Sequence, residues 1–346
     1  MNATTYAADI AKNVLQVHWV DPVSGEIGRK KLTRAKFTEF FASRQPARIA
    51  MEACGGAHHW GRTFEAMGHS VELLPARQVR AFVWGNKDDA ADARAIWMAA
   101  QQGDIRRVPV KTPDQQAVQF LHRTRAHWVS LRTATVNLLR SMLYEFGVLL
   151  PQGRNCGLQA LAERRAAFEE SLPAPVLRLI DAQIQVLREM DRQVVAVEAE
   201  LTLVQKQSQT AKRLRAVPGL GLLGATALAS LLGKDGRAWR NAREFACCLG
   251  LVPKHTGTGG KVQMGGISKR GDPYIRTILI SGARCVMAHL KNPPEWIVKL
   301  QARRPANVVA VAIANKLARM AWAIVAHGRD YDQRWSVSPA TPGLVG

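Results

Sequence analysis

The sequence has 346 residues, of which 47% are hydrophobic and 22% charged, so it is typical of a folded chain and excludes wholesale disorder. Its length is sufficient for two domains, each with its own core. Lysine and arginine number 48 against 27 acidic residues, which gives a formal net charge of +21. This excess indicates a polyanionic partner, with nucleic acid the first candidate, although ribosome-associated and membrane-surface proteins share it.

The cysteines and the N-terminus predict a cytoplasmic protein with no membrane segment. The five cysteines are scattered without C-x-x-C spacing, which favours reduced thiols over a zinc site or a disulfide framework. No basic leader followed by an apolar run opens the chain, so no signal peptide is expected. The uncharged stretch 216–233 contains Pro218 and several glycines, which predict a turn and a short buried helix and not a membrane span.

Strand and helix signals alternate through the first hundred residues. Three β-prone runs come first, at 4–10, 14–20 and 26–32, and predict an antiparallel start to a sheet. A helix at 34–43, a strand at 48–53, a helix at 58–67, a strand at 70–74 and a helix at 89–102 follow. This order of elements is that of an RNase H-like α/β fold.

Long helices are predicted from residue 113 onward. In 175–204 seven apolar residues recur with a mean period of 3.5: Ile180, Ile184, Leu187, Met190, Val194, Val197 and Leu201. That period favours a left-handed coiled coil, within the chain or between protomers. An ordinary two-helix hairpin inside one subunit accounts for the same pattern.

A third region begins near residue 212. The sequence Val217-Pro218-Gly219-Leu220-Gly221, followed by an alanine-rich helix, resembles a helix-hairpin-helix turn, whose backbone amides commonly bind a nucleic-acid phosphate. Residues 250–271 are rich in glycine and basic residues, and helices resume up to about residue 325. The last residues contain serine and proline and predict a frayed tail.

Four acidic residues lie where an RNase H-like sheet would bring them together. Asp9 ends the first strand, Glu52 lies near the end of the fourth, and Asp89 and Asp92 share one face of the following helix. Asp88 with Asp92 is the competing pair, which spacing alone does not separate. Converging carboxylates repel one another unless cations neutralise them, and Mg²⁺ takes oxygen ligands and phosphate together. The alternative is that these are unrelated surface acids.

The glycine-rich segment carries charge and hydroxyl groups suited to phosphate chemistry. Its basic residues, opposed only by Asp272, are Lys254, Lys261, Lys269, Arg270 and Arg276, which are candidates for nucleic-acid binding. Thr256, Thr258 or Ser268 could attack a phosphodiester if a base or a metal lowered the barrier. A loop that binds phosphate without a covalent role explains the same residues. The spacing G-x-x-x-x-G-K-[ST] of a Walker A loop is absent.

Six motifs, in this order between about residues 4 and 325, resemble the DEDD-type insertion-sequence transposases. These are relatives of the pilin-gene invertases and include the bridge-RNA-guided recombinases. The motifs are Ala8-Asp9, Met51-Glu52-Ala53-Cys54-Gly55, Lys87-Asp88-Asp89 with Asp92-Ala93-Arg94, Val217-Pro218-Gly219-Leu220-Gly221, Gly250-Leu251-Val252-Pro253, and Gly266-Ile267-Ser268-Lys269-Arg270-Gly271-Asp272.

The resemblance implies a domain plan. A RuvC-like catalytic domain would occupy residues 1–110, a helical coiled-coil connector 111–211, a mainly α-helical transposase domain with the turn and the nucleophile loop 212–328, and a tail 329–346.

The resemblance also implies site residues. Asp9, Glu52, Asp89 and Asp92 match the four acids of the family and would be both catalytic and Mg²⁺-binding. The family has a variable residue where Asp88 stands, which selects Asp89. Counting from Pro253, the position of the family's nucleophilic serine is occupied by Thr258, with Ser268 as the alternative nucleophile.

The expected function is therefore a transposase that cuts and rejoins DNA strands of an insertion sequence with Mg²⁺ and a hydroxyl nucleophile. Its partners would be donor and target DNA, a guide RNA encoded by the element, and further copies of the chain in a dimer or tetramer. A hydrolytic junction-cutting nuclease, in which water attacks, is one alternative. A non-catalytic nucleic-acid-binding protein is the other.

Overall fold

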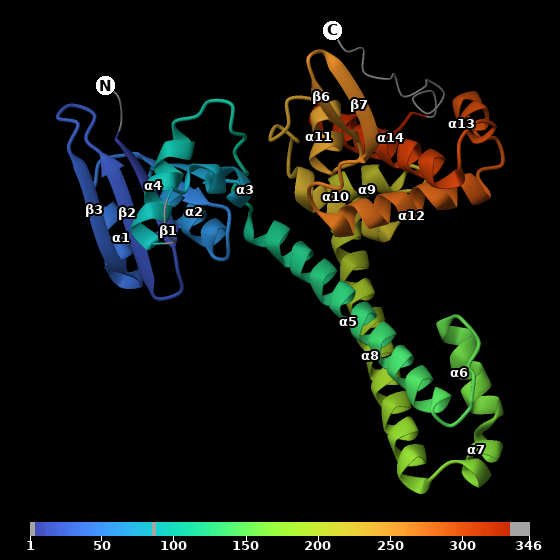
Figure 1. The fold of residues 1–346 in the computed structure, drawn as a ribbon. Helices are drawn as coiled ribbons and strands as arrows, with labels where there is room; N and C mark the ends of the chain where they lie inside the picture. The colour runs from blue at the N-terminus through green and yellow to red at the C-terminus, as the bar shows by residue number, and fades with distance from the viewer. Residues whose placement is uncertain (1–3, 85–87, 333–346) are drawn as a thin grey trace. The chain divides into compact units, whose positions relative to one another are not determined.

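The computed structural model describes residues 4–84 and 88–332 and divides into two compact units, Met1–Gln115 and Gln116–Gly346 (Figure 1). Lys87 of the third motif lies outside the described residues, as does the predicted tail from residue 333 onward.

The first unit is built on a five-stranded mixed sheet with the order β3-β2-β1-β4-β5. Its strands are β1 (Thr5–Ile10), β2 (Val14–Val20), β3 (Ile27–Thr33), β4 (Arg48–Glu52) and β5 (Ser70–Leu74). The first three are antiparallel, whereas β1, β4 and β5 run parallel. The predicted antiparallel start and the adjacency of the first and fourth strands are confirmed, and the sheet is consistent with an RNase H-like fold.

Helices cover both faces of this sheet. On one face α1 (Arg34–Ala42) and α2 (Ala57–Ala66) bury an aromatic cluster that includes Phe37, Phe41 and Phe64. On the other face α4 (Asp89–Ala100) packs directly against the strands, with the short helices α3 (Ala76–Val79) and η1 (Arg80–Phe82) beside it. The contact between α4 and the strands is made largely by alanines, among them Ala7, Ala50, Ala95 and Ala99, which are fully buried. Such small side chains let the helix backbone approach the sheet closely.

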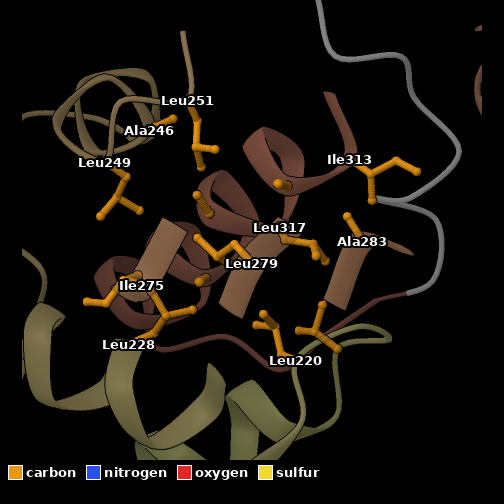
Figure 2. Packing of buried hydrophobic residues seen from close by; sticks show 14 of the residues in the cluster. Leu220, Leu228, Ala246, Leu249, Leu251, Ile275, Leu279, Ala283, Ile313 and Leu317 are labelled. Atoms are coloured by element: carbon orange, nitrogen blue, oxygen red, sulfur yellow. The ribbon is translucent and has the colours of Figure 1, made fainter. Parts of the chain in front are cut away.

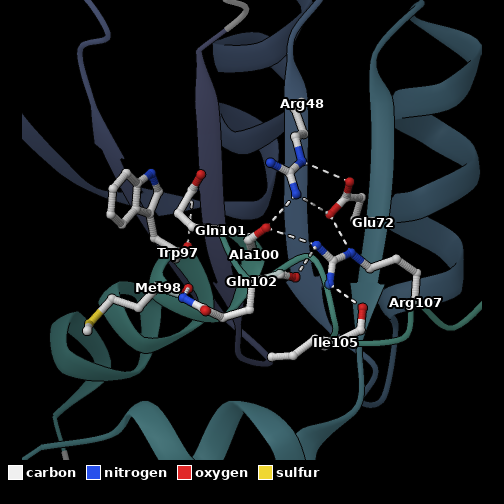
Figure 3. Close-up of polar contacts among 9 residues, drawn as sticks. All are labelled: Arg48, Glu72, Trp97, Met98, Ala100, Gln101, Gln102, Ile105 and Arg107. Carbon is white, nitrogen blue, oxygen red and sulfur yellow. Dashed lines mark hydrogen bonds and ion pairs between the residues drawn. The ribbon is translucent and has the colours of Figure 1, made fainter.

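An ion-pair network fixes the C-terminal end of α4 at the sheet (Figure 3). Glu72 on β5 accepts hydrogen bonds from Arg48 on β4, at 2.8 Å, and from Arg107, at 2.7 Å. Both guanidinium groups also donate to the carbonyl of Ala100, the last residue of the helix. Because Arg48 begins β4 and Glu52 ends it, anchoring the C-terminus of α4 near Arg48 directs its N-terminus toward Glu52.

Two long helices run antiparallel at the start of the second unit. They are α5 (Pro113–Tyr144) and α8 (Ala174–Gln207), and α6 (Arg154–Glu163) and α7 (Arg165–Ser171) connect them. Ion pairs cross between them, Arg125 with Glu198 at 2.6 Å and Arg132 with Asp191 at 2.9 Å. Six of the seven predicted seam residues are buried and Ile184 is half-buried. The seam therefore pairs within the chain, as a two-helix hairpin.

The remaining helices of this unit enclose one apolar core (Figure 2). They are α9 (Gln209–Arg215), α10 (Leu222–Leu232), α11 (Ala242–Cys248), α12 (Pro273–His289), α13 (Glu295–Gln301) and α14 (Ala306–His327). Leu279 and Leu317 lie near the centre of this core in the view, and Leu228 lies beside Ile275 at the lower left. By length and composition α14 could cross a membrane, yet 56% of its apolar window is buried in this unit, so it is the central core helix here.

The turn between α9 and α10 packs tightly on α12. Gly219 has a φ of +91°, and a Cβ added at Gly282 would lie 2.0 Å from the carbonyl oxygen of Gly219. The expected turn between two helices is therefore present. Its glycines are needed for the positive φ and for the close approach of two backbones.

Candidate active site

Asp9 and Glu52 occupy neighbouring positions at the same edge of the sheet. The parallel pairing of β1 with β4 aligns Ala7 with Ala50 and Ala8 with Met51, and the next residues along each strand are Asp9 and Glu52. Side chains alternate between faces along a strand, so both acids point to the face of Ala7 and Ala50. That face is covered by α4.

The first turn of α4 brings two further acids to this edge. Asp89 and Asp92 lie in that turn, whereas Asp88 is the N-cap residue and its carboxylate accepts from the backbone N–H of Ala90. The partial positive charge at a helix N-terminus stabilises nearby carboxylates. Asp88 thus caps the start of the helix, and Asp89 and Asp92 are the acids whose charges act on Asp9.

The charges of these four residues are coupled. Burial, together with repulsion from Asp92, Asp89 and Glu52, raises the pKa of Asp9 from 3.8 to about 6, and burial is the largest cause. Burial and then Asp92 also raise the pKa of Glu52. The predicted acids therefore share one electrostatic environment, although they come from three separate segments of the chain.

The four carboxylates offer the kind of ligand atom that a hard divalent cation prefers. Carboxylate oxygens are the ligands that Mg²⁺ prefers, and a cation would relieve the repulsion that raises the pKa of Asp9. Among the residues that the structure describes, no three histidine, cysteine, aspartate or glutamate side chains lie at metal-ligating spacing. Mg²⁺ commonly binds through one or two carboxylates and completes its shell with water and phosphate oxygens.

Cys54 is a neighbour of the acids that the sequence did not single out. It follows Glu52 by two residues and is half-buried. Burial raises the pKa of its thiol, and the charges of Glu52 and Asp9 raise it further. The thiol is therefore held protonated beside the carboxylates. The sequence signal that could have identified Cys54 is its position two residues after Glu52, the acidic residue that ends β4.

The glycine-rich segment is a β-hairpin and not the expected loop. It consists of β6 (Pro253–Thr258) and β7 (Lys261–Ile267), which pair antiparallel and rise from the helices in Figure 1. Gly259 and Gly260 form its two-residue turn, with φ values of +57° and +79°. Positive φ at both central residues is typical of the turn that matches the twist of a hairpin. The segment is ordered because its glycines meet this requirement.

The two candidate hydroxyls differ in access. Thr258 is exposed and is the last residue of β6, directly before the turn. Ser268 lies just past β7 at the base of the hairpin. Its Oγ is buried there and neither donates nor accepts a hydrogen bond among the described residues. A phosphodiester could reach the first hydroxyl and not the second.

The base of the hairpin is closed by backbone contacts and by Arg276. A Cβ at Gly250 would lie 2.3 Å from the carbonyl oxygen of Arg270, so the two segments meet without room for a side chain. Arg276 is half-buried and donates from Nη1 to the carbonyls of Leu249, at 3.1 Å, and Arg270, at 2.9 Å. This guanidinium therefore holds the hairpin in place.

The other four predicted nucleic-acid-binding residues are solvent-exposed. They are Lys254, Lys261, Lys269 and Arg270. Lys269 has a φ of +53°, an uncommon conformation for a residue with a side chain. Their charges lie along the hairpin and at its base, where a phosphate backbone could contact them.

Comparison with known proteins identifies the family. Residues 7–147 match the model of the DEDD transposases of the IS110 type, and residues 211–297 match that of the transposase IS116/IS110/IS902 family. The chain is 42% identical to a probable family 20 transposase of Pseudomonas aeruginosa, over 96% of this chain and 99% of that protein. It is 37% identical to the transposase for insertion sequence element IS1328 of Yersinia enterocolitica, over 94% of this chain and 98% of that one. The transposase for element IS1111A of Coxiella burnetii is 35% identical, over 93% and 90%.

These matches span nearly the whole chain and agree with the resemblance that the sequence motifs carry. The chain belongs to the IS110 family of insertion-sequence transposases, enzymes that catalyse DNA strand transfer.

Proposed function

We propose that this transposase cuts and rejoins DNA through a covalent link between Thr258 and the DNA, with divalent cations bound by Asp9, Glu52, Asp89 and Asp92. The observation that supports the proposal is that four carboxylates, from the ends of β1 and β4 and the first turn of α4, meet at one edge of the sheet, where three of them raise the pKa of Asp9. Acids so placed cost folding energy, and a function that needs them explains their presence.

The acids and the hydroxyl have separate roles in this proposal. Bound divalent ions would supply charge stabilisation to the attacking and leaving oxygens of a phosphoryl transfer. The carboxylates of Asp9 and Glu52 hold position because β1 and β4 are central strands, and Asp89 and Asp92 because α4 is anchored at its other end. The family's divalent metal is Mg²⁺ in our proposal, because the donors are all carboxylate oxygens.

Thr258 supplies the nucleophile. Its Oγ forms a bond to the scissile phosphorus and gives its proton to a general base. The bond from phosphorus to the leaving 3′-oxygen of the DNA breaks and that oxygen takes up a proton, which leaves a 3′-hydroxyl and a phosphothreonine link to the 5′ side. Attack by a DNA 3′-hydroxyl then reverses these steps on the new strand without external energy. A threonine methyl crowds such an attack, and the exposed position beside a glycine turn reduces that crowding.

The partners follow from the same proposal. Donor and target DNA are the substrates, and Lys254, Lys261, Lys269 and Arg270 bind their backbones. The net charge of +21 is far larger than the four positive charges of these residues, which supports an additional RNA partner as guide. Strand exchange joins two DNA duplexes, so we propose that a dimer or tetramer performs it. Sequencing of the nucleic acid that co-purifies with the protein tests the RNA, and absence of a defined RNA contradicts it.

A pair of substitutions tests the covalent step. Thr258→Ala removes the hydroxyl, and we expect it to abolish both strand transfer and the protein–DNA adduct on denaturing gels. Thr258→Ser keeps the hydroxyl and removes the methyl, so both should remain. Ser268→Ala is the control for a buried hydroxyl and should retain the adduct.

Two results would contradict the mechanism. If Thr258→Ala cuts DNA as fast as the unaltered chain, water attacks and the protein acts as a junction nuclease. If strand exchange survives both Asp9→Asn and removal of Mg²⁺, the acids do not act through a metal, and a DNA-binding role without catalysis by this site becomes the better account.

A further inference from the structure

The β6–β7 hairpin has two chemically different faces. Residues paired across antiparallel strands point to the same side, and the side alternates with each step. Thr258 pairs with Lys261 and Thr256 with Gln263, which makes one face polar. Gly257 pairs with Val262 and His255 with Met264, which makes the opposite face apolar.

The apolar face is strongly exposed. Val262 is 62% exposed and Met264 68% exposed, whereas many valine, leucine and isoleucine side chains in the core of this unit are almost completely buried. The residue opposite Val262 is Gly257, so the hairpin cannot cover that valine with a side chain of its own. A Cβ at Gly257 would lie 2.4 Å from the carbonyl oxygen of Lys261, which excludes any larger residue in this conformation.

Folding alone does not account for this face. A two-stranded hairpin without cover is marginally stable in water, and Val and Met at neighbouring exposed positions add surface that favours contact with a partner. Only Ile267, at the base of β7, is half-buried, whereas every other strand residue is exposed. The face is therefore available for a ligand. It lies on the side of the hairpin opposite Thr258, so a ligand bound there would be close to the proposed nucleophile.

The charge around the hairpin indicates which ligand. Between residues 250 and 271 there is no acidic residue, whereas Lys254, Lys261, Lys269 and Arg270 are all exposed. An apolar face bordered only by positive charge is suited to DNA, because DNA presents apolar base surfaces flanked by phosphates. Met, Leu and Ile side chains are used in this way when proteins insert between base steps and open or kink a duplex.

We propose that the apolar face of the β6–β7 hairpin, formed by Val262 and Met264 with His255 beside them, packs against bases of a distorted duplex while Thr258 on the other face meets the scissile phosphate. Within the described part of the chain, every residue of the two strands except Ile267 is exposed, so DNA can contact both faces at once. The proposal rests on the proposed function, because it places this surface at the step that is cut. Exchange of strands requires bases to leave their pairs, and apolar contact lowers the cost of exposing them.

Site-specific crosslinking tests the contact. The photoreactive amino acid p-benzoylphenylalanine is placed at position 264 of the full chain, which is mixed with duplex DNA that carries the abutted ends of the chain's own insertion sequence, and the sample is irradiated. The matched control is position 195 on α8, where Val195 is 66% exposed and lies far along the chain from the hairpin. We expect DNA adducts from position 264 at least tenfold above those from position 195.

Other adducts overturn the proposal. Crosslinks from position 264 to a second copy of the protein would make the face an interface between protomers. Crosslinks to RNA alone would make it a guide-binding surface, and absence of any adduct would leave the face without a nucleic-acid role.

A double substitution tests the consequence for the reaction. Val262→Thr with Met264→Gln keeps the size and strand propensity of both residues and removes the apolar face. We expect strand transfer to fall about tenfold or more, with reduced fluorescence of 2-aminopurine placed at the cut step, while Val195→Thr leaves both unchanged. Unaltered transfer and fluorescence in the double variant would refute the proposal.

This design separates the inference from the proposed function. Binding does not need the nucleophile, so Thr258→Ala should still give the adduct from position 264. If that adduct forms and Thr258→Ala remains active, the covalent mechanism fails and the DNA contact stands. If Thr258→Ala is inactive and no adduct forms from position 264, the DNA contact fails alone.

Discussion

Substitution of Asp9 by asparagine should stabilise this protein in the absence of metal. Asp9 has a pKa of about 6 in the folded chain, whereas its ordinary value is 3.8. The ionised form is therefore disfavoured by folding, first because it is buried and then because Asp92, Asp89 and Glu52 repel it. Asparagine has nearly the same shape and no charge, so it removes the repulsion and keeps the packing.

The size of the effect follows from the change in pKa. A rise of this magnitude corresponds to about 3 kcal/mol for a fully buried group. Asp9 is only half-buried, so solvent screening reduces the expected gain in the free energy of unfolding to about 1–2 kcal/mol at pH 8. For a unit of this size the melting temperature should rise by about 3–8 °C.

The pH dependence has a definite sign. The folded chain binds a proton at Asp9 more tightly than the unfolded chain, so this residue makes stability fall as pH rises from about 4 to about 6. The difference between Asp9→Asn and the unaltered chain should therefore be fully present above pH 6 and vanish toward pH 4. Thermal unfolding in EDTA at several pH values measures it. Equal or lower stability of the variant at pH 8 would show that Asp9 does not lie in a field of like charges.

Two further substitutions test how the fold positions the site. Gly282→Ala should destabilise the second unit by about 1–3 kcal/mol, because the new Cβ would lie 2.0 Å from the Gly219 carbonyl oxygen. Gly224→Ala is the control and should not destabilise it, because its Cβ would lie 3.4 Å from the nearest atom. Equal stabilities of the two variants in urea unfolding would contradict this packing. Glu72→Gln should lower the free energy of unfolding by about 1–2 kcal/mol, because it leaves Arg48 and Arg107 without their anion. It should also slow strand transfer, because α4 is then anchored less firmly. Unchanged stability and rate in this variant would show that the ion-pair network does not anchor the helix.

The sheet of the first unit was predictable because its local signals agree. Residues 14–20 and 70–74 were expected as strands and are strands, since each is a short apolar or β-branched run between turn signals. The position of Asp9 beside Glu52 follows from sheet order alone. The preference for Asp89 over Asp88 did not follow from spacing, because the helix cap that occupies Asp88 is a hydrogen bond and not a pattern.

The hairpin at 253–267 was harder to foresee because glycine lowers strand propensity. Five glycines in this segment read as a flexible loop, yet Gly259 and Gly260 provide the turn and Gly257 allows the close approach of the two strands. The burial of the Ser268 hydroxyl depends on contacts at the base of the hairpin that sequence spacing does not contain. The pairing of the α8 seam within the chain was one of the options open from its period, and the structure decides it.

Binding of Mn²⁺ to the full chain, measured by isothermal titration calorimetry as a substitute for Mg²⁺, tests the central claim most directly. If the four acids form a cation site, the unaltered chain should bind Mn²⁺, and Asp9→Asn and Asp92→Asn should each weaken binding at least tenfold. Asp88→Asn is the matched control, because asparagine also caps a helix, and its affinity should equal that of the unaltered chain. Unchanged affinity in Asp9→Asn, or an equal loss in Asp88→Asn, would contradict the account.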